Sequence, residues 1–248
     1  MKDKTWYEDW FSDEHYLALY RHRDTEEAGE VLDLIERSTG VTKESAILDL
    51  ACGAGRYSIA LAKRGYQHIT AIDLSPTLIA EAKRNAEVEG VTIDFIHDDM
   101  RDFDGSFDLI VNLFTSFGYF QTDVENSDVI THISKHLNSG GKFVLDFFNA
   151  EFVVNTLSPY DEKQLRSGER VELYRKIINH RVEKRIIIHS TGSTKEYHES
   201  VRLFDLDDFA NMFESNGLRV IHCFGDYDGS PFEQGSSPRL FLVAQKNG

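Results

Sequence analysis

The sequence contains only two cysteines, Cys52 and Cys223, among 248 residues. Two cysteines cannot build a disulfide framework or a four-thiolate zinc site, so neither is expected, and no metal site is predicted. Cys52 lies beside a pair of glycines, where a small side chain packs easily. We therefore expect Cys52 to be a packing residue rather than a nucleophile.

Long apolar runs are also missing. No stretch approaches the roughly 18 apolar residues that a membrane-spanning helix needs. The N-terminal segment MKDKTWYEDW has no apolar core of the kind found in secretory signals. A cytoplasmic protein without a membrane partner is therefore expected.

Basic residues are scarce relative to acidic ones. The chain has 27 Lys and Arg against 42 Asp and Glu, which gives a formal net charge of −15. Such a surface repels phosphate backbones on average and disfavours a nucleic-acid partner, although a local basic patch would override this. The length suits one core with an insertion, in a chain that is a monomer or a homodimer.

The most informative stretch is ILDLACGAGR, which begins at Ile47. Its apolar start predicts a buried parallel strand, and the Gly-Ala-Gly that follows predicts a sharp turn into a helix over Arg56–Lys63. Gly53 and Gly55 lack a Cβ atom, so they can adopt positive φ and let a ligand approach the backbone. The Asp49 carboxylate would repel a pyrophosphate and attract an ammonium group.

A second acidic residue follows the next apolar run. The strand Ile69–Ile72 ends on Asp73, where a carboxylate is well placed to accept hydrogen bonds from both hydroxyls of a ribose. The turn departs from the full G-x-G-x-x-G dinucleotide pattern, because Ser58 stands where the third glycine would be.

ILDLACGAGR followed by ITAIDLS resembles the cofactor-binding core of class I S-adenosylmethionine-dependent methyltransferases. HDDMRDF resembles the segment that contacts adenine, FDLIVNLFTSFGYF the fourth strand with its loop, and LNSGGKFVLDFFN the fifth strand. These matches follow in order over residues 45–150. The resemblance implies S-adenosylmethionine as cofactor, S-adenosylhomocysteine as product, and an α/β fold. That fold is a doubly wound Rossmann-like seven-stranded sheet, parallel with one antiparallel strand.

The resemblance also implies which residues bind the cofactor. Asp99, or its neighbour Asp98, would accept a hydrogen bond from the adenine amino group, and the Met100 backbone N–H would bind a ring nitrogen. Arg56 would reach the cofactor carboxylate, unless it is simply solvated. The whole expected set is Tyr20, Asp49, Ala51, Gly53, Gly55, Arg56, Asp73, Leu74, Asp98, Asp99, Met100 and Asn112.

Residues 6–20 are unusually aromatic and predict a helical arm. The arm is expected to pack on the body, to cover the active site as a lid, or to do both, and in the family such segments often cover the site. The candidates for contacting the methionine end of the cofactor or the substrate are Tyr7, Tyr16 and Tyr20 of this segment and Arg21, which follows it. We expect one domain over 1–248, with an arm at 1–40, a cofactor-binding core at 41–150 and 205–248, and an inserted β cap at 151–204.

The remaining elements are read from periodicity and turn signals. We expect a helix at Val129–Leu137 that is stopped by Gly140-Gly141. After the fifth strand, an antiparallel insert of three strands is predicted at Val171–Ile178, Val182–His189 and Lys195–Phe204. The other expected elements are helices at Glu26–Ser38, at 76–90 and at Asp205–Ser215, and strands at Val91–Ile96, Phe107–Val111, Lys142–Phe147, Leu218–Phe224 and Arg239–Gln245.

The resemblance favours methyl transfer to a small-molecule N or O nucleophile, by in-line displacement in a desolvated cleft. Tyr119 and His198 are the candidate general bases. The loop after the fourth strand lacks the prolines that amino-methylating DNA enzymes carry there, which disfavours that reaction.

Two alternatives stay open. One is a protein or RNA methyltransferase that docks through the β insert, which a basic face made by Arg175, Lys176, Arg181, Lys184 and Arg185 would favour. The other is a protein that binds S-adenosylmethionine without transferring its methyl group.

Overall fold

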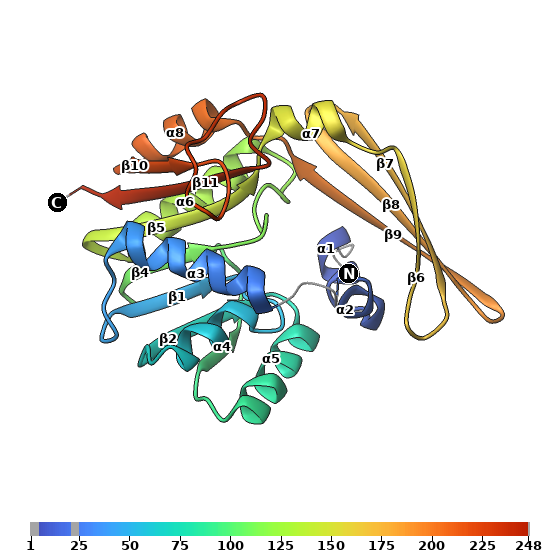
Figure 1. Cartoon of the computed structure of the whole chain (residues 1–248), viewed down its shortest axis with the longest axis horizontal. Helices are drawn as coiled ribbons and strands as arrows, with labels where there is room; N and C mark the ends of the chain where they lie inside the picture. The colour runs from blue at the N-terminus through green and yellow to red at the C-terminus, as the bar shows by residue number, and fades with distance from the viewer. Residues whose placement is uncertain (1–4, 21–24, 248) are drawn as a thin grey trace.

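The computed structural model describes residues 5–20 and 25–247, whose strands form two β-sheets (Figure 1). In this part of the chain the larger sheet has seven strands in the order β10-β11-β5-β4-β1-β2-β3. Strand β11 runs antiparallel to both of its neighbours, whereas the other neighbouring pairs are parallel. The predicted Rossmann-like sheet is therefore confirmed. Its strands are β1 (Ala46–Leu50), β2 (His68–Asp73), β3 (Asp94–His97), β4 (Phe107–Asn112), β5 (Leu137–Phe148), β10 (Leu218–Phe224) and β11 (Arg239–Lys246).

Helices bury both faces of this sheet. Ile47 of β1 packs with α3 (Thr25–Thr39) and α4 (Arg56–Lys63) in one hydrophobic cluster. Leu48 and Leu50, which point the other way, pack with α6 (Asp123–His136) and α8 (Leu206–Glu214) in another. Because successive side chains of a strand point to opposite faces, one apolar strand supplies both cores.

The helices that begin at the carboxyl ends of the strands start as their local sequences predict. Helix α4 begins after Gly55, which has a φ of 81°. Helix α5 (Pro76–Glu89) has Ser75 as its N-cap, which accepts the Leu78 N–H, and ends at Gly90 with a φ of 67°. These signals involve only residues close in sequence, so they need no knowledge of the tertiary fold.

Two predicted boundaries around α6 were wrong. The helix starts at Asp123 rather than Val129, because Thr122 and Glu125 form a reciprocal capping box. It ends at His136, and the two glycines expected to stop it lie inside β5 instead. A Cβ at Gly141 would lie 2.8 Å from the Asn138 carbonyl oxygen, so glycine is needed for the close backbone approach.

The insert is an antiparallel meander of four strands, not three: β6 (Tyr160–Gln164), β7 (Arg170–Ile178), β8 (Arg181–Ser190) and β9 (Ser193–Arg202). Strand β6 was missed because its sequence, YDEKQ, has no apolar alternation. The short helix α7 (Ala150–Thr156), capped by Asn149, was also missed. We call these four strands the cap sheet.

The arm consists of two short helices, α1 (Trp6–Trp10) and α2 (Glu14–Tyr20), which lie between the large sheet and the cap sheet (Figure 1). Trp10 and Leu19 are buried in a hydrophobic cluster with Val171 and Ile186 of the cap sheet. The Trp10 indole N–H also donates to Glu199 Oε1 at 2.7 Å. The arm and the cap sheet therefore share a core of their own.

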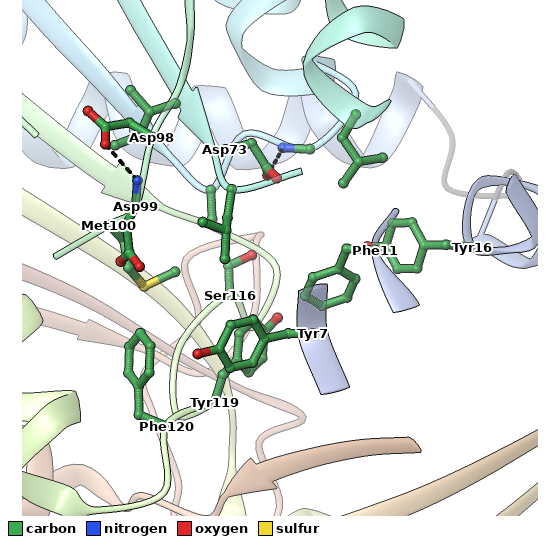
Figure 2. A pocket seen from close by; sticks show the side chains of 15 residues that line it. Tyr7, Phe11, Tyr16, Asp73, Asp98, Asp99, Met100, Ser116, Tyr119 and Phe120 are labelled. Atoms are coloured by element: carbon green, nitrogen blue, oxygen red, sulfur yellow. Dashed lines mark hydrogen bonds between the residues drawn. The ribbon is translucent and has the colours of Figure 1, made fainter. Parts of the chain in front are cut away.

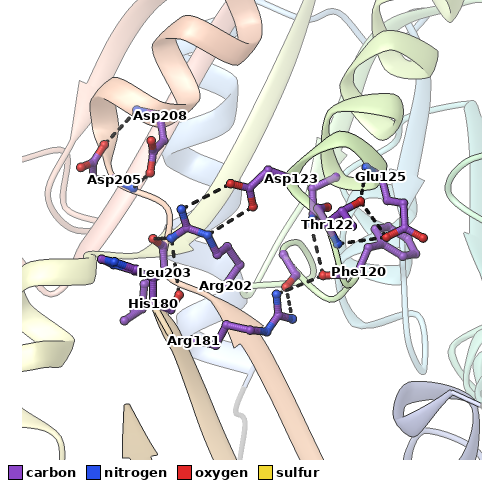
Figure 3. Close-up of polar contacts among 12 residues, drawn as sticks. Phe120, Thr122, Asp123, Glu125, His180, Arg181, Arg202, Leu203, Asp205 and Asp208 are labelled. Atoms are coloured by element: carbon purple, nitrogen blue, oxygen red, sulfur yellow. Dashed lines mark hydrogen bonds and ion pairs between the residues drawn. The ribbon is translucent and has the colours of Figure 1, made fainter. Parts of the chain in front are cut away.

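Two arginines join the base of the cap sheet to the loop between β4 and α6 (Figure 3). Arg181 donates to the carbonyl oxygens of Gly118 and Phe120 at 3.1 and 3.0 Å. Arg202 forms an ion pair with Asp123 at 3.2 Å, and its backbone N–H donates to the Gly118 carbonyl. This loop is thus held by the cap as well as by the core.

None of the helices in residues 5–20 and 25–247 is long and apolar enough to cross a membrane.

Replacing Trp10 by alanine tests the shared core. Because Trp10 is fully buried, we expect Trp10→Ala to lower the free energy of unfolding by about 3–5 kcal/mol. Val124→Ala, at a side chain that is 70% exposed, is the control and should change it by less than about 0.5 kcal/mol. Urea unfolding measures both, and a loss at Trp10 as small as that of the control would show that the arm is not part of the core.

Candidate active site

A small cavity of about 70 Å³ lies at the carboxyl ends of β1 and β2, covered by aromatic rings of the arm (Figure 2). Tyr7 and Phe11 of the arm point toward Tyr119 on the loop after β4. Seven of the residues expected to bind the cofactor line this cavity: Ala51, Gly53, Asp73, Leu74, Asp98, Asp99 and Met100.

The glycine turn has the backbone that the sequence predicts. Gly53 and Gly55 have φ values of 59° and 81°, and Ala51 also adopts a positive φ of 63°. A Cβ atom added to Gly53 would meet no protein atom within 4 Å, so this face of the turn is open to a ligand. Gly55 has another role, because a Cβ there would press on Ala82 and Phe95 at 3.1 Å.

Asp73 links the turn to the following helix. Its Oδ2 accepts the Gly53 N–H and its Oδ1 accepts the Ser75 N–H, both at 2.8 Å (Figure 2 shows the first). The side chain is buried, and this desolvation raises the pKa of the carboxyl group. Each oxygen keeps a lone pair that can accept a further hydrogen bond from a ligand hydroxyl.

The two acids after β3 differ in their partners. Arg101 binds both oxygens of Asp99, with Nε at 3.0 Å from Oδ1 and Nη2 at 2.6 Å from Oδ2. Burial opposes ionisation of Asp99, but the Arg101 hydrogen bonds outweigh it and lower the pKa. Asp98 Oδ1 accepts the Asp99 backbone N–H at 2.9 Å (Figure 2), and no arginine among the described residues pairs with Asp98 as Arg101 does with Asp99.

Asp49 provides a second buried carboxylate beside the turn. Ser58 donates its hydroxyl to Asp49 Oδ2 at 2.5 Å. Burial, together with the neighbouring Asp73 charge, raises the pKa of Asp49 to about 6, although the Ser58 hydrogen bonds and the Arg56 charge oppose the shift. An ammonium or sulfonium group bound nearby would favour the ionised form.

A larger cavity of about 940 Å³ adjoins the first and extends between the glycine turn, the arm and the inner face of the cap sheet. Arg56 lines it and is paired with Glu27 at 2.9 Å. Tyr20 also lines it and donates its hydroxyl to Glu199 Oε1 at 2.8 Å. The residues that line both cavities are Phe11, Tyr16, Ala51, Gly53, Ser116 and Tyr119.

The cap contributes an ion pair to this cavity that the sequence did not reveal. Lys184 and Glu199 face the arm from neighbouring strands, with Nζ and Oε2 3.1 Å apart. In the sequence both residues stand among other polar residues, so the pattern of polar and apolar residues does not show which face of the sheet they occupy. Only the strand register shows that both point inward with Val182 and Val201.

The two candidate bases lie in different places. Tyr119 lines both cavities and donates its hydroxyl to the Thr115 carbonyl oxygen at 2.8 Å. His198 lies on the outer face of the cap sheet, with a side chain that is 61% exposed and 3.2 Å from Glu196. The structure does not bring His198 to either cavity, because its neighbours Tyr197 and Glu199 occupy the inward positions.

Asn112, another residue predicted to bind the cofactor, lies outside the lining of the site. It is fully buried and lines neither cavity. Its amide donates to the carbonyl oxygens of Leu50 and Ser116, which ties the end of β1 to the loop after β4. Arg21, a further candidate for the cofactor's methionine end, lies outside the described residues.

Comparison with known proteins gives three kinds of similarity. Residues 47–141 match the family model described as a methyltransferase domain. The chain is 26% identical over 226 residues to dTDP-3-amino-3,4,6-trideoxy-alpha-D-glucopyranose N,N-dimethyltransferase of Streptomyces venezuelae, covering 86% of this chain and 92% of that protein. It is 27% identical over 220 residues to cypemycin N-terminal methyltransferase of Streptomyces sp., covering 81% and 83%.

A solved structure shares the fold. The S-adenosylmethionine-dependent methyltransferase from Clostridium acetobutylicum ATCC 824 superposes with a TM-score of 0.80 at 18% identity, covering 94% of this chain and 97% of that chain. Because the cap sheet is longer than the uncovered part of the chain, the likeness extends beyond the large sheet into the cap sheet.

Removing the Asp73 carboxylate should weaken cofactor binding. We expect Asp73→Ala to reduce the affinity for S-adenosylmethionine by about 1.5–3 kcal/mol, because hydrogen bonds to a charged acceptor are lost. Asp94→Ala, at an exposed acid of β3, is the control. Calorimetric titration measures both, and equal affinities of the two variants would remove Asp73 from the cofactor site.

The raised pKa of Asp49 predicts a pH dependence of cofactor affinity. Because the ionised carboxylate attracts the cationic cofactor, the affinity should rise from pH 5 through the pKa of about 6 and level off by pH 7. The free energy of unfolding should change in the opposite direction. Because the pKa of Asp49 is raised from its ordinary value of 3.8 to about 6 in the folded state, its contribution to stability is lost as pH rises between these two values. Titrations at several pH values test this, and a profile in Asp49→Asn as steep as in the wild type would contradict it.

Proposed function

We propose that the chain, whose residues 47–141 match a methyltransferase domain, is a class I S-adenosylmethionine-dependent methyltransferase that methylates a nitrogen or oxygen of a small molecule. The observation that carries this proposal is the cavity of about 940 Å³ beside the glycine turn. Ligand pockets for small molecules have volumes of about 300–1,000 Å³. The cavity therefore has room for an acceptor next to the cofactor.

The cofactor would lie along the smaller cavity and reach into the larger one. Asp98 and Met100 would bind the adenine, Asp73 the ribose, and Gly53 would lie against the methionine part. Asp49 would attract its ammonium group, and Arg56 would pair with its carboxylate. The sulfonium would then sit beside Tyr119, where the two cavities adjoin.

The arm would act as a lid in this arrangement. A cavity of about 70 Å³ is much smaller than the pockets that usually hold a nucleoside-sized ligand. Tyr7, Phe11 and Tyr16 would therefore move outward to admit the adenosyl group and close over it afterwards. Closure by three aromatic rings would also exclude water from the reacting atoms.

S-adenosylmethionine supplies the methyl group and the leaving group for an in-line displacement. The chain's own residues would hold the acceptor in line and keep water out. Aromatic faces at Tyr119 and Phe11 would each stabilise a nearby cation by about 0.5–2 kcal/mol. The Tyr119 hydroxyl, oriented by the Thr115 carbonyl, is the group proposed to contact the acceptor's proton.

Nitrogen is the favoured acceptor atom. Glu14 and Glu199 also line the larger cavity and would attract a protonated amine, which must lose a proton before its nitrogen attacks the methyl group. The names of the two relatives described above refer to an N,N-dimethyltransferase and an N-terminal methyltransferase. The first candidate acceptor is therefore an amino group on a sugar-like molecule. The second is the free amino group of a short peptide.

The insert offers little support for docking of RNA. The five basic residues that would form a docking face are divided between the two faces of the cap sheet. Arg175 and Lys184 point into the larger cavity, whereas Arg185 lies on the outer face, where it is paired with Glu196. Arg181 is occupied by carbonyl oxygens of the loop after β4.

A turnover assay with an acceptor panel tests the proposal. We expect S-adenosylhomocysteine to form with amino sugars, their nucleotide derivatives or small amines, and less with phenols and carboxylic acids. Gly53→Val should fold but give no product, because its side chain occupies the open face of the glycine turn. Turnover restricted to RNA or to folded proteins would contradict the proposal.

A further inference from the structure

Two consecutive residues of the loop after β4 have an unusual backbone. Phe114 and Thr115 have φ values of 59° and 61°, in the left-handed region that favours glycine. A β-branched residue such as threonine is rarely found there. Both residues line the larger cavity. Backbone strain of this kind persists only where the surrounding structure holds it in place.

A buried ion pair provides that support. Asp146 of β5 is fully buried and accepts the Phe114 N–H through Oδ2 at 2.9 Å. Its backbone carbonyl accepts the Thr115 N–H, also at 2.9 Å. Arg239 of β11 donates through Nη2 to the Thr115 hydroxyl at 3.1 Å. Both strained residues are therefore bound to the same pair of neighbouring strands.

Hydrogen bonds join the two side chains of the pair directly. Arg239 donates to Asp146 Oδ1 through Nε at 2.9 Å and through Nη2 at 2.6 Å. The Tyr227 hydroxyl donates to Oδ2 at 3.0 Å. A buried ion pair is weak evidence for a stabilising role, because removing two charges from water opposes the gain from their attraction. Its contacts with the strained loop suggest that it fixes a conformation.

A hydrogen bond connects the strained backbone of Phe114 and Thr115 with the site. The carbonyl of Thr115 accepts the hydroxyl of Tyr119, which lines both cavities. If the Phe114–Thr115 backbone changed to the right-handed region, the carbonyl would turn and the hydroxyl would lose this partner. The position of the Tyr119 hydroxyl thus depends on Asp146 and Arg239.

We propose that Asp146 and Arg239 are positioning residues for methyl transfer, which hold the Phe114–Thr115 backbone so that Tyr119 faces the acceptor. The inference rests on the proposed function, because it assigns Tyr119 a contact with the acceptor. Neither residue of the pair was singled out by the sequence patterns for this role.

Conservative variants of the pair test the inference. Arg239→Lys keeps the charge, but an ammonium group cannot donate through two fixed N–H groups to Asp146 Oδ1 and reach Thr115 as a planar guanidinium does. We expect kcat to fall about 10- to 100-fold through misplacement of the reacting groups, while the dissociation constant of S-adenosylhomocysteine is unchanged. Amide hydrogen exchange should become faster in residues 113–119. Asp146→Asn should have the same effects.

Arg64→Gln is the matched control. Arg64 pairs with Asp33 and Glu36 at 2.7 and 2.9 Å, and it lines neither cavity. Its loss should lower the melting temperature without changing kcat per folded molecule. If Arg239→Lys behaves like this control, the pair is only structural and the inference is overturned.

A rescue variant separates positioning from stability. Glycine adopts a positive φ without steric cost, so adding Thr115→Gly to Arg239→Lys should restore part of the lost kcat. A further loss of kcat in the double variant would contradict the inference. If the wild type methylates no acceptor, the proposed function fails, and hydrogen exchange still decides whether the pair holds the loop. Unchanged exchange in residues 113–119 would then refute it.

Discussion

The site depends on one buried carboxylate, that of Asp73, which accepts backbone N–H groups from both Gly53 and Ser75. These bonds fix the glycine turn after β1 against the start of the helix after β2. They leave the turn open on the side where a Cβ at Gly53 would meet nothing. A cofactor can therefore lie against backbone atoms, which no side chain at this position would allow.

A cofactor bound at the carboxyl ends of the strands of the large sheet would be exposed to water if this sheet and its helices stood alone. The arm and the cap sheet change this, because they share a hydrophobic core around Trp10 and together bound a cavity of about 940 Å³. Methyl transfer gains most of its rate from alignment and desolvation. In the proposed function, the arm and the cap sheet would therefore decide which acceptor enters and how well it is shielded.

Local signals made much of the site predictable from sequence. The glycine turn, the carboxylate at the end of β2 and the cap of α5 involve only neighbouring residues, and each lies where the sequence predicts it. Strand register is not local. It places His198 outside and Glu199 inside, although they are adjacent in sequence. The polar strand β6 and the buried pair of Asp146 and Arg239 depend on partners far along the chain, which periodicity cannot reveal.

The central claim is that the cofactor's reactive end faces the cavity between the core and the cap. A crystal structure of the complex with S-adenosylhomocysteine tests it most directly. The account predicts the ribose hydroxyls on Asp73 and the sulfur beside Tyr119, pointing into the larger cavity. A sulfur that points to the outer surface, with the larger cavity cut off from it, would contradict the account.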